Sequence, residues 1–273
     1  MIEAILAFFF GLLAGSFLNV CIHRWPRGRS VVKPRSHCVR CRKTIAWYDN
    51  IPLVSYAVLR GRCRHCGKRI SARYPLVELV TGLLFFYFVF TLGPTPAAVK
   101  MCIFSAILVG LIFCDLEKRI LPDELTVGGA LAGLVFALFV PVPDITAGAL
   151  LWIFGVELGG TLESLAESVC GALLPALILW GGGWVYYKVR HREGLGFGDV
   201  KLVAMVGSFL GMRGALLTLI IGSIFGSILG YGYIKATGKD AATYELPFGT
   251  FLGAAALAAA IAGPKMLEWY GGL

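Results

Sequence analysis

The sequence is poor in charged residues, and in acidic residues above all. Lys, Arg, Asp and Glu make up 15% of its 273 residues, and 25 basic residues outnumber 16 acidic ones. Soluble domains carry about 25% charged and roughly 45–50% apolar residues. Here 58% of the residues are apolar and the mean hydropathy is +0.78. This composition excludes an ordinary soluble enzyme, a coiled coil and a disordered chain, and it leaves a protein with several membrane-spanning helices.

A cleavable secretory signal is also lacking. The first apolar run, residues 2–22, has no basic residue before it and several after it. Signal peptides show the opposite arrangement, with a basic segment ahead of the apolar one. We therefore expect residues 1–22 to form the first transmembrane helix.

Long apolar runs recur along the rest of the chain. A helix that crosses a bilayer needs about 20 apolar residues. The predicted spans are 2–22, 76–93, 99–115, 125–141, 168–187, 199–212, 214–234 and 248–263. The apolar segment 145–158 is short, and we interpret it as interfacial or as an extension of the fourth helix. The predicted fold class is an all-α polytopic membrane protein with about eight transmembrane helices.

Positive charge is concentrated in residues 23–75, which hold fourteen Lys or Arg and a single acid, Asp49. Cytoplasmic segments of membrane proteins are enriched in Lys and Arg, so this module is expected inside and both termini outside. Alternation then puts 116–124, 188–198 and 235–247 inside as well. Only Lys100, Arg213 and Lys265 fall outside these segments and their edges. This pattern is typical of membrane topology, and we expect contact with membrane lipid and none with nucleic acid.

The predicted outer loop 142–167 contains no basic residue. Its acids are Asp144, Glu157, Glu163 and Glu167. A loop without Lys or Arg agrees with an outer location.

Four cysteines in the basic module have the spacing of a metal site. Cys38 and Cys41 form one CxxC pair, and Cys63 and Cys66 form a second one after 21 residues. Two such pairs are typical of a tetrahedral structural zinc site, and a reducing cytoplasm disfavours disulfides. His37 and His65 remain alternative ligands of a variant site. The other cysteines, which we expect to pack as small apolar residues, are Cys21, Cys102, Cys114 and Cys170.

Acids at the ends of apolar runs are candidates for chemistry, because burying a carboxylate near lipid is costly. Asp115 ends one run, Asp199 follows Gly196-Phe197-Gly198, and Glu78 opens the second span. The topology puts Asp115 and Asp199 at the same depth. Two aspartates that meet share a proton, so that one activates water and the other polarises a carbonyl.

Plainer interpretations of these acids remain. Asp199 is also suited to cap a helix N-terminus, and Asp115 to be a boundary acid offset by Lys118 or Arg119. Asp123 and Glu124 are rivals for the first catalytic position, although an N-cap is the simpler role for Asp123. Membrane acids also serve as ion sites in transporters and channels, and a membrane scaffold that docks through its zinc module is a third class.

The ordered motifs together resemble the bifunctional bacterial prepilin peptidases, which are leader peptidases and N-methyltransferases of type IV pilus and type II secretion systems. The motifs are Gly15–Val20 with His23-Arg24, the cysteine quartet, Asp49–Tyr56, Arg60–Arg64, Ser71–Glu78, Asp115-Leu116 with Leu121–Asp123, Gly196–Leu202 and Leu246–Gly249. The small departures, Val39 where Pro is frequent and Arg62 where Lys is frequent, touch neither the aspartates nor the cysteines.

The resemblance implies that Asp115 and Asp199 are catalytic and that Cys38, Cys41, Cys63 and Cys66 bind structural zinc. It implies cleavage of prepilins and related pseudopilins after a short basic leader, at the cytoplasmic face of the bacterial inner membrane. The new N-terminal residue would then be methylated with S-adenosylmethionine. Three parts follow: the first helix (1–22), the zinc-binding module (23–75) and a transmembrane aspartic peptidase core (76–273).

The residues themselves do not locate a methyl-donor site. No GxGxxG follows an expected strand, and the run Gly181–Gly183 is interpreted as close helix packing.

Overall fold

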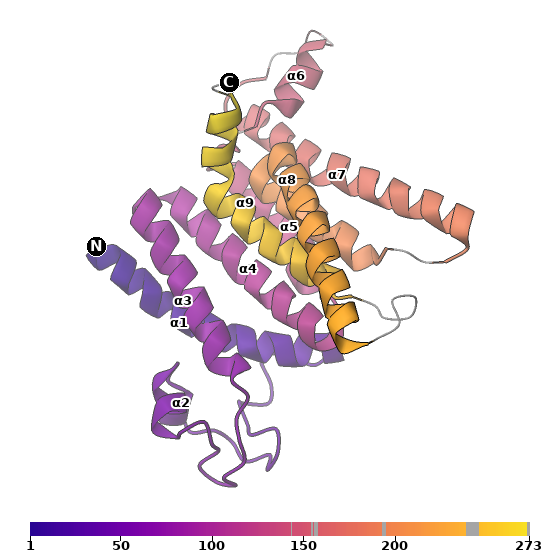
Figure 1. Cartoon of the computed structure of the whole chain (residues 1–273). Helices are drawn as coiled ribbons and strands as arrows, with labels where there is room; N and C mark the ends of the chain where they lie inside the picture. Colours follow the sequence, from indigo (N-terminus) through magenta and orange to yellow (C-terminus); the bar gives the residue numbers. More distant parts are fainter. Residues whose placement is uncertain (143, 154, 156–157, 193–194, 239–245, 272–273) are drawn as a thin grey trace. The chain divides into compact units, whose positions relative to one another are not determined.

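The computed structural model describes residues 1–142, 144–153, 155, 158–192, 195–238 and 246–271, with the side chains of 263–271 left aside. Two isolated antiparallel bridges, His37 with Thr44 and Arg62 with Arg69, are the nearest approach to a sheet in these ranges. Everything else with regular structure is helical (Figure 1). The predicted all-α class is therefore confirmed.

The helices follow the apolar runs of the sequence. Five of them are long and apolar enough to cross a membrane: α1, α3, α4, α7 and α8. In chain order the elements are α1 (Ile2–Arg24), η1 (Trp25–Arg27), η2 (Trp47–Asn50), α2 (Val54–Val58), α3 (Arg73–Leu92), α4 (Pro96–Lys118), α5 (Asp123–Ala137), α6 (Thr146–Ile153), α7 (Thr161–Arg190), α8 (Phe197–Thr237) and α9 (Phe248–Gly271).

The chain forms two compact units, Met1–Gly110 and Leu111–Leu273. In the first unit, α1 packs along α3 with very close backbones. A Cβ on Gly15 would lie 2.7 Å from the Cα of Glu78, and the amide of Asn19 donates to the carbonyl of Tyr74 at 3.0 Å. Small residues permit this approach between membrane helices. The basic module 23–75 connects the end of α1 to the start of α3.

In the second unit, α8 packs against α5, α7 and α9. It is two helices joined at Gly211, whose φ of 75° is left-handed. The predicted spans 199–212 and 214–234 correspond to its two halves. Asp144 sits at this break: its Oδ2 accepts the backbone N–H of Arg213 at 2.9 Å, and its Oδ1 accepts that of Ile145 at 2.8 Å.

Three local expectations turn out differently or lie outside the described residues. The segment 145–158 does not extend the fourth helix, because α5 ends at Ala137 and the separate helix α6 begins at Thr146. In the run Gly181–Gly183, the first two glycines have open space where a Cβ would stand, and a Cβ on Gly183 would lie 3.2 Å from the side chain of Leu195. The run therefore packs against a loop residue at one position, and the expected close packing between helices is wrong. Glu157 of the predicted outer loop, and residues 239–245 of the predicted inner segment 235–247, are outside the described residues.

Candidate active site and metal centre

Asp115 lies in the last turn of α4, buried at 5% exposure. Its Oδ2 accepts two hydrogen bonds from Thr250, one from the backbone N–H at 2.6 Å and one from the side-chain Oγ1 at 2.8 Å. Thr250 is the third residue of α9. The first N–H groups of a helix have no partner within it and carry partial positive charge. The carboxylate of Asp115 therefore sits at a helix N-terminus that favours its ionised form.

Asp199 is the third residue of α8 and is half-buried. Its carboxyl group lies within electrostatic range of that of Asp115. A Cβ on Gly196 would come within 3.3 Å of Asp199 Oδ2, so glycine leaves open space beside that oxygen. The structure thus brings together two aspartates that are far apart in the sequence.

Leu121 packs between the two helix starts that hold these groups. Its side chain would be 3.3 Å from a Cβ on Gly198 and 3.0 Å from one on Gly249. A Cβ on Gly249 would also approach the Cγ of Asp115 at 3.3 Å. Glycine at both positions lets the segment after α4 lie directly against the starts of α8 and α9. Both glycines belong to the motifs quoted above, and these contacts give a reason for each of them.

The rival acids have other surroundings. Asp123 is exposed and forms an ion pair with Lys201. The N-cap of α5 is Pro122 and no side chain caps it, so the N-cap role expected for Asp123 is wrong. Asp199 is not an N-cap either, because Gly196 occupies that position of α8.

In the first unit, Glu78 is buried, and its Oε2 accepts the backbone N–H of Leu53 at 2.9 Å. Glu78 thus ties the basic module to α3.

The two carboxyl groups are not equivalent. Asp115 has both donors of Thr250, whereas the carboxyl of Asp199 has no hydrogen-bond donor among the described residues. Hydrogen bonds to a carboxylate stabilise its charge, and a like charge nearby opposes a second ionisation. A single shared proton is therefore expected to reside on Asp199. Such a pair can accept a proton from water at one carboxyl and donate one at the other.

Thr250 is the residue of this site that sequence analysis missed. The quoted motif Leu246–Gly249 stops immediately before it. The only signal was the glycine at the start of a helix, which marks a close approach without naming the approaching group.

The four predicted cysteine ligands are brought together in the first unit. The Sγ atoms of Cys38, Cys41, Cys63 and Cys66 all lie within 4.8 Å of one another. Each pair closes a small turn in the same way: Cys38 N–H donates to Lys43 O, and Cys63 N–H donates to Lys68 O, both at 2.9 Å. Four thiols from two such turns are a donor set that fits tetrahedral zinc.

The backbone of the second pair favours a thiolate at Cys63, its first cysteine. The N–H groups of Cys66 and His65 point at the sulfur of Cys63 and lower the pKa of its thiol to about 7. Metal-binding cysteines must be deprotonated, so this turn is prepared for a cation. No imidazole belongs to the cluster, which leaves the cysteines as the candidate ligands.

Comparison with known proteins gives the family. The chain matches the bacterial peptidase A24 N-terminal domain over residues 9–92 and the type IV leader peptidase family over residues 102–231. It is 35% identical, over 290 residues, to the prepilin leader peptidase/N-methyltransferase of Aeromonas salmonicida, with 97% of this chain and 92% of that protein covered. The chain belongs to the type IV leader peptidase family. The resemblance seen in its motifs is thereby confirmed.

Other members of the family are similar over different lengths. The protein of the same name from Myxococcus xanthus is 42% identical over 236 residues, which cover 86% of this chain and 64% of that protein. This chain therefore spans less than two thirds of the Myxococcus relative. A Klebsiella pneumoniae protein of that name is 38% identical over 79% of this chain and 89% of its own length. No solved structure matches the chain.

Proposed function

We propose that this protein is a membrane-embedded aspartic leader peptidase whose two catalytic groups are Asp115 and Asp199. The observation that carries the proposal is the proximity of the two carboxyl groups where the end of α4 meets the starts of α8 and α9, with Thr250 bonded to Asp115. A transporter site is less well supported, because such sites lie at broken helices near the bilayer midplane. The break in α8 is instead at Gly211, twelve residues after Asp199.

In the proposed reaction, ionised Asp115 accepts a proton from water as that water attacks the scissile carbonyl carbon. Protonated Asp199 donates its proton to the carbonyl oxygen, which gives a neutral tetrahedral intermediate. Collapse of the intermediate breaks the C–N bond, Asp115 passes its proton to the departing amine, and Asp199 recovers its own from the hydroxyl. Asp115 is then ionised again and ready for another cycle, with the two hydrogen bonds from Thr250 stabilising its charge in this resting state.

The proposed substrates are prepilins and related pseudopilins with a short basic leader. The names of the similar proteins from Aeromonas and Myxococcus support this class. Cleavage would occur at the cytoplasmic side of the bacterial inner membrane, with the basic module inside and both termini outside. The concentration of Lys and Arg in residues 23–75 supports that orientation.

A second activity, N-methylation of the new N-terminus, is proposed from the same names. S-adenosylmethionine supplies an electrophilic methyl group, to which the terminal amine nitrogen bonds as the carbon–sulfur bond breaks and a proton leaves for water. The proposed metal is zinc, held by Cys38, Cys41, Cys63 and Cys66 as a structural site. The convergence of four sulfurs on one point supports it.

The deciding experiment is incubation of the purified full chain with a model prepilin, read by mass spectrometry with and without methyl donor. Asp115→Asn and Asp199→Asn should each abolish cleavage while membrane insertion is retained. Asp123→Asn is the matched control, because Asp123 is exposed and paired with Lys201. Near-normal cleavage by either of the first two variants would remove that residue from the reaction.

A further inference from the structure

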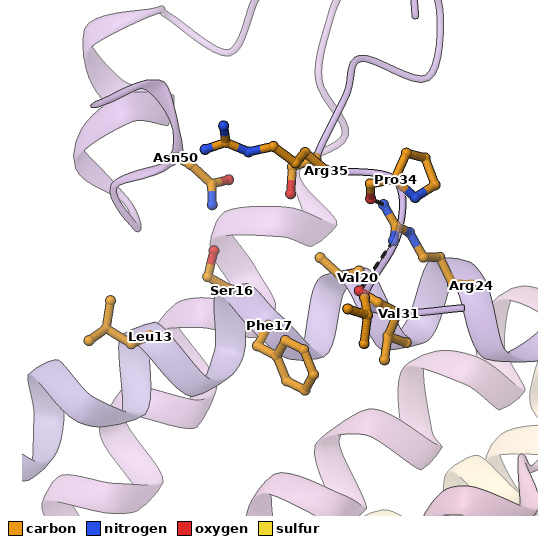
Figure 2. Close-up of a pocket in the computed structure, with 11 residues that line it drawn as sticks. Leu13, Ser16, Phe17, Val20, Arg24, Val31, Pro34, Arg35 and Asn50 are labelled. Atoms are coloured by element: carbon orange, nitrogen blue, oxygen red, sulfur yellow. Dashed lines mark hydrogen bonds between the residues drawn. The ribbon is translucent and has the colours of Figure 1, made fainter. Parts of the chain in front are cut away.

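The first unit contains a cavity of about 370 Å³ where the cytoplasm-facing end of α1 meets the segments on either side of the first cysteine pair. Its lining comes from three separate stretches of the basic half: Ser16 and Phe17 on α1, Val31–Ser36 ahead of Cys38, and Asn50 at the end of η2 (Figure 2). Those stretches overlap motifs that the aspartate chemistry does not use. A volume in this range is typical of small-molecule sites.

Arg24 builds one wall of this cavity. It is buried at 6% exposure, and its guanidinium donates to the carbonyls of Ser30, Val31 and Pro34 at 2.7–3.2 Å (Figure 2). A single side chain thus fixes the turn that leads from α1 toward Cys38. The guanidinium of Arg24 is therefore engaged in holding the backbone of this turn.

Arg35 has the opposite situation. Its guanidinium is exposed and has no hydrogen-bond or ion-pair partner in the described part of the chain. Figure 2 shows it reaching over the cavity toward the amide of Asn50, which also has no partner there. One end of the cavity therefore offers a fork of donors that suits a carboxylate.

Ser16 gives the cavity a contrasting pole beneath Asn50 (Figure 2). The hydroxyl of Ser16 lies beside the buried carboxyl group of Glu78, close enough to interact with it. The lone pairs of Ser16 remain for a donor in the cavity, with the negative charge of Glu78 behind them. The guanidinium of Arg35 at one end of the cavity matches the carboxylate of an amino-acid zwitterion. The hydroxyl oxygen of Ser16, with Glu78 behind it, matches the ammonium group.

Apart from Ser36, the remaining lining is apolar and includes one aromatic ring, that of Phe17. The other apolar residues are Leu13, Val20, Val31, Val32 and Pro34. An aromatic face attracts cations and stacks with flat rings. A ligand with an amino-acid head, a cationic centre and an aromatic base would use Arg35, Ser16 and this apolar part together.

We propose that this cavity is the site of S-adenosylmethionine, with Arg35 receiving its carboxylate and Ser16 its ammonium group. The inference rests on the proposed methyltransferase activity and goes beyond it by assigning the donor site to the first unit, on a different unit from the two aspartates. An anionic lipid headgroup would use Arg35 but would leave the Ser16–Glu78 pole without a partner. The donor is therefore the better match.

The test measures equilibrium binding of radiolabelled S-adenosylmethionine to the full chain in detergent, without substrate. Arg35→Gln should weaken binding about ten-fold or more, because a hydrogen bond between charged groups is lost. Arg35→Lys should recover part of the affinity. Arg40→Gln is the control, since Arg40 is another exposed arginine of the module that does not line the cavity. Unchanged zinc content would establish that the Arg35 variants are folded.

The outcomes separate this inference from the proposed function. Wild-type affinity in Arg35→Gln would overturn the donor site, even if the wild-type protein cleaves and methylates a prepilin. Loss of co-purifying anionic phospholipid in that variant, with donor affinity unchanged, would identify a lipid site and also overturn it. A wild-type protein that neither cleaves nor methylates would instead overturn the proposed function.

Discussion

At the scale of single residues, the division of roles between the two aspartates depends on Thr250. Its backbone N–H and its hydroxyl both bond to Asp115 Oδ2. A substitution can remove the hydroxyl and leave the backbone bond in place, so the side chain's share is measurable.

We expect Thr250→Val to lower the cleavage rate about ten-fold or more, because a hydrogen bond to a charged group is worth roughly 1.5–3 kcal/mol. The rate of prepilin processing measures this effect. Thr250→Ser keeps the hydroxyl and should stay near wild type. A Val variant as fast as the Ser variant would contradict the role assigned to the hydroxyl.

The two cysteine turns differ at one equivalent residue. Gly67, directly after Cys66, has a φ of 66°, and Arg42, directly after Cys41, has a φ of 59°. The left-handed region costs a non-glycine residue about 1–2 kcal/mol, while glycine loses roughly 0.5–1 kcal/mol more chain entropy on folding. The first turn is therefore strained where the second is relaxed.

Arg42→Gly should thus stabilise the metal-bound module by up to about 1 kcal/mol. Zinc release to a competing chelator would be slower than in the wild type. The reciprocal change, Gly67→Arg, should make release faster. Faster release from Arg42→Gly would mean that the arginine side chain contributes more than its backbone conformation costs.

At the scale of elements, η2 is held to the second cysteine turn by one ion pair. Arg64 donates to both oxygens of Asp49 at 2.6 and 2.8 Å, and this hydrogen bonding lowers the pKa of Asp49 below its usual 3.8. A lowered carboxyl pKa gives stability that is present above the unfolded value and is lost as the pH falls through the folded one. The pair therefore remains intact from neutral pH down to about pH 4.

Since Asn50 follows Asp49 directly, Asp49→Asn should loosen the cavity and weaken S-adenosylmethionine binding a few-fold, less than Arg35→Gln does. Because the pair is intact at both ends of the range, the ratio of mutant to wild-type affinity should be the same at pH 5.5 and pH 8. A ratio that changes across this range would show that another group titrates at the site.

How far the sequence predicts each element depends on whether its signal is local. The spacing of Cys38, Cys41, Cys63 and Cys66 contains the whole donor set, and the short gap between 199–212 and 214–234 marks the break in α8. A contact such as that of Thr250 with Asp115 joins residues 135 positions apart, and neither their spacing nor a local motif predicts it. The cavity lined by Ser16, Arg35 and Asn50 was not foreseen for the same reason.

At the scale of the whole molecule, the two proposed chemistries lie on different units. The cysteines and the cavity belong to Met1–Gly110, and Asp115, Asp199 and Thr250 belong to Leu111–Leu273. Metal binding supplies much of the folding free energy of small zinc modules. Damage to the metal site should therefore act first on the unit that contains it.

We expect Cys63→Ser to lose zinc and to reduce methylation much more than cleavage. Both activities are measured by mass spectrometry in one preparation, beside metal analysis. Cys102→Ser is the control, because Cys102 lies in the same unit but outside the metal cluster. Equal loss of both activities would mean that the module is structural for the entire enzyme.

The break in α8 also bears on how the chain enters the membrane. Straight, its 41 residues would extend about 60 Å, twice the roughly 30 Å of hydrocarbon. Gly211 divides this length into two helices with almost no loop between them. In the proposed topology the first half crosses outward and the second returns, so the two halves form one hairpin. In the proposed topology, Arg213 at its tip runs against the rule for basic residues, and Asp144 offsets that charge locally. We therefore expect the two halves to enter the bilayer together during biosynthesis, with the charge at the tip already neutralised by Asp144.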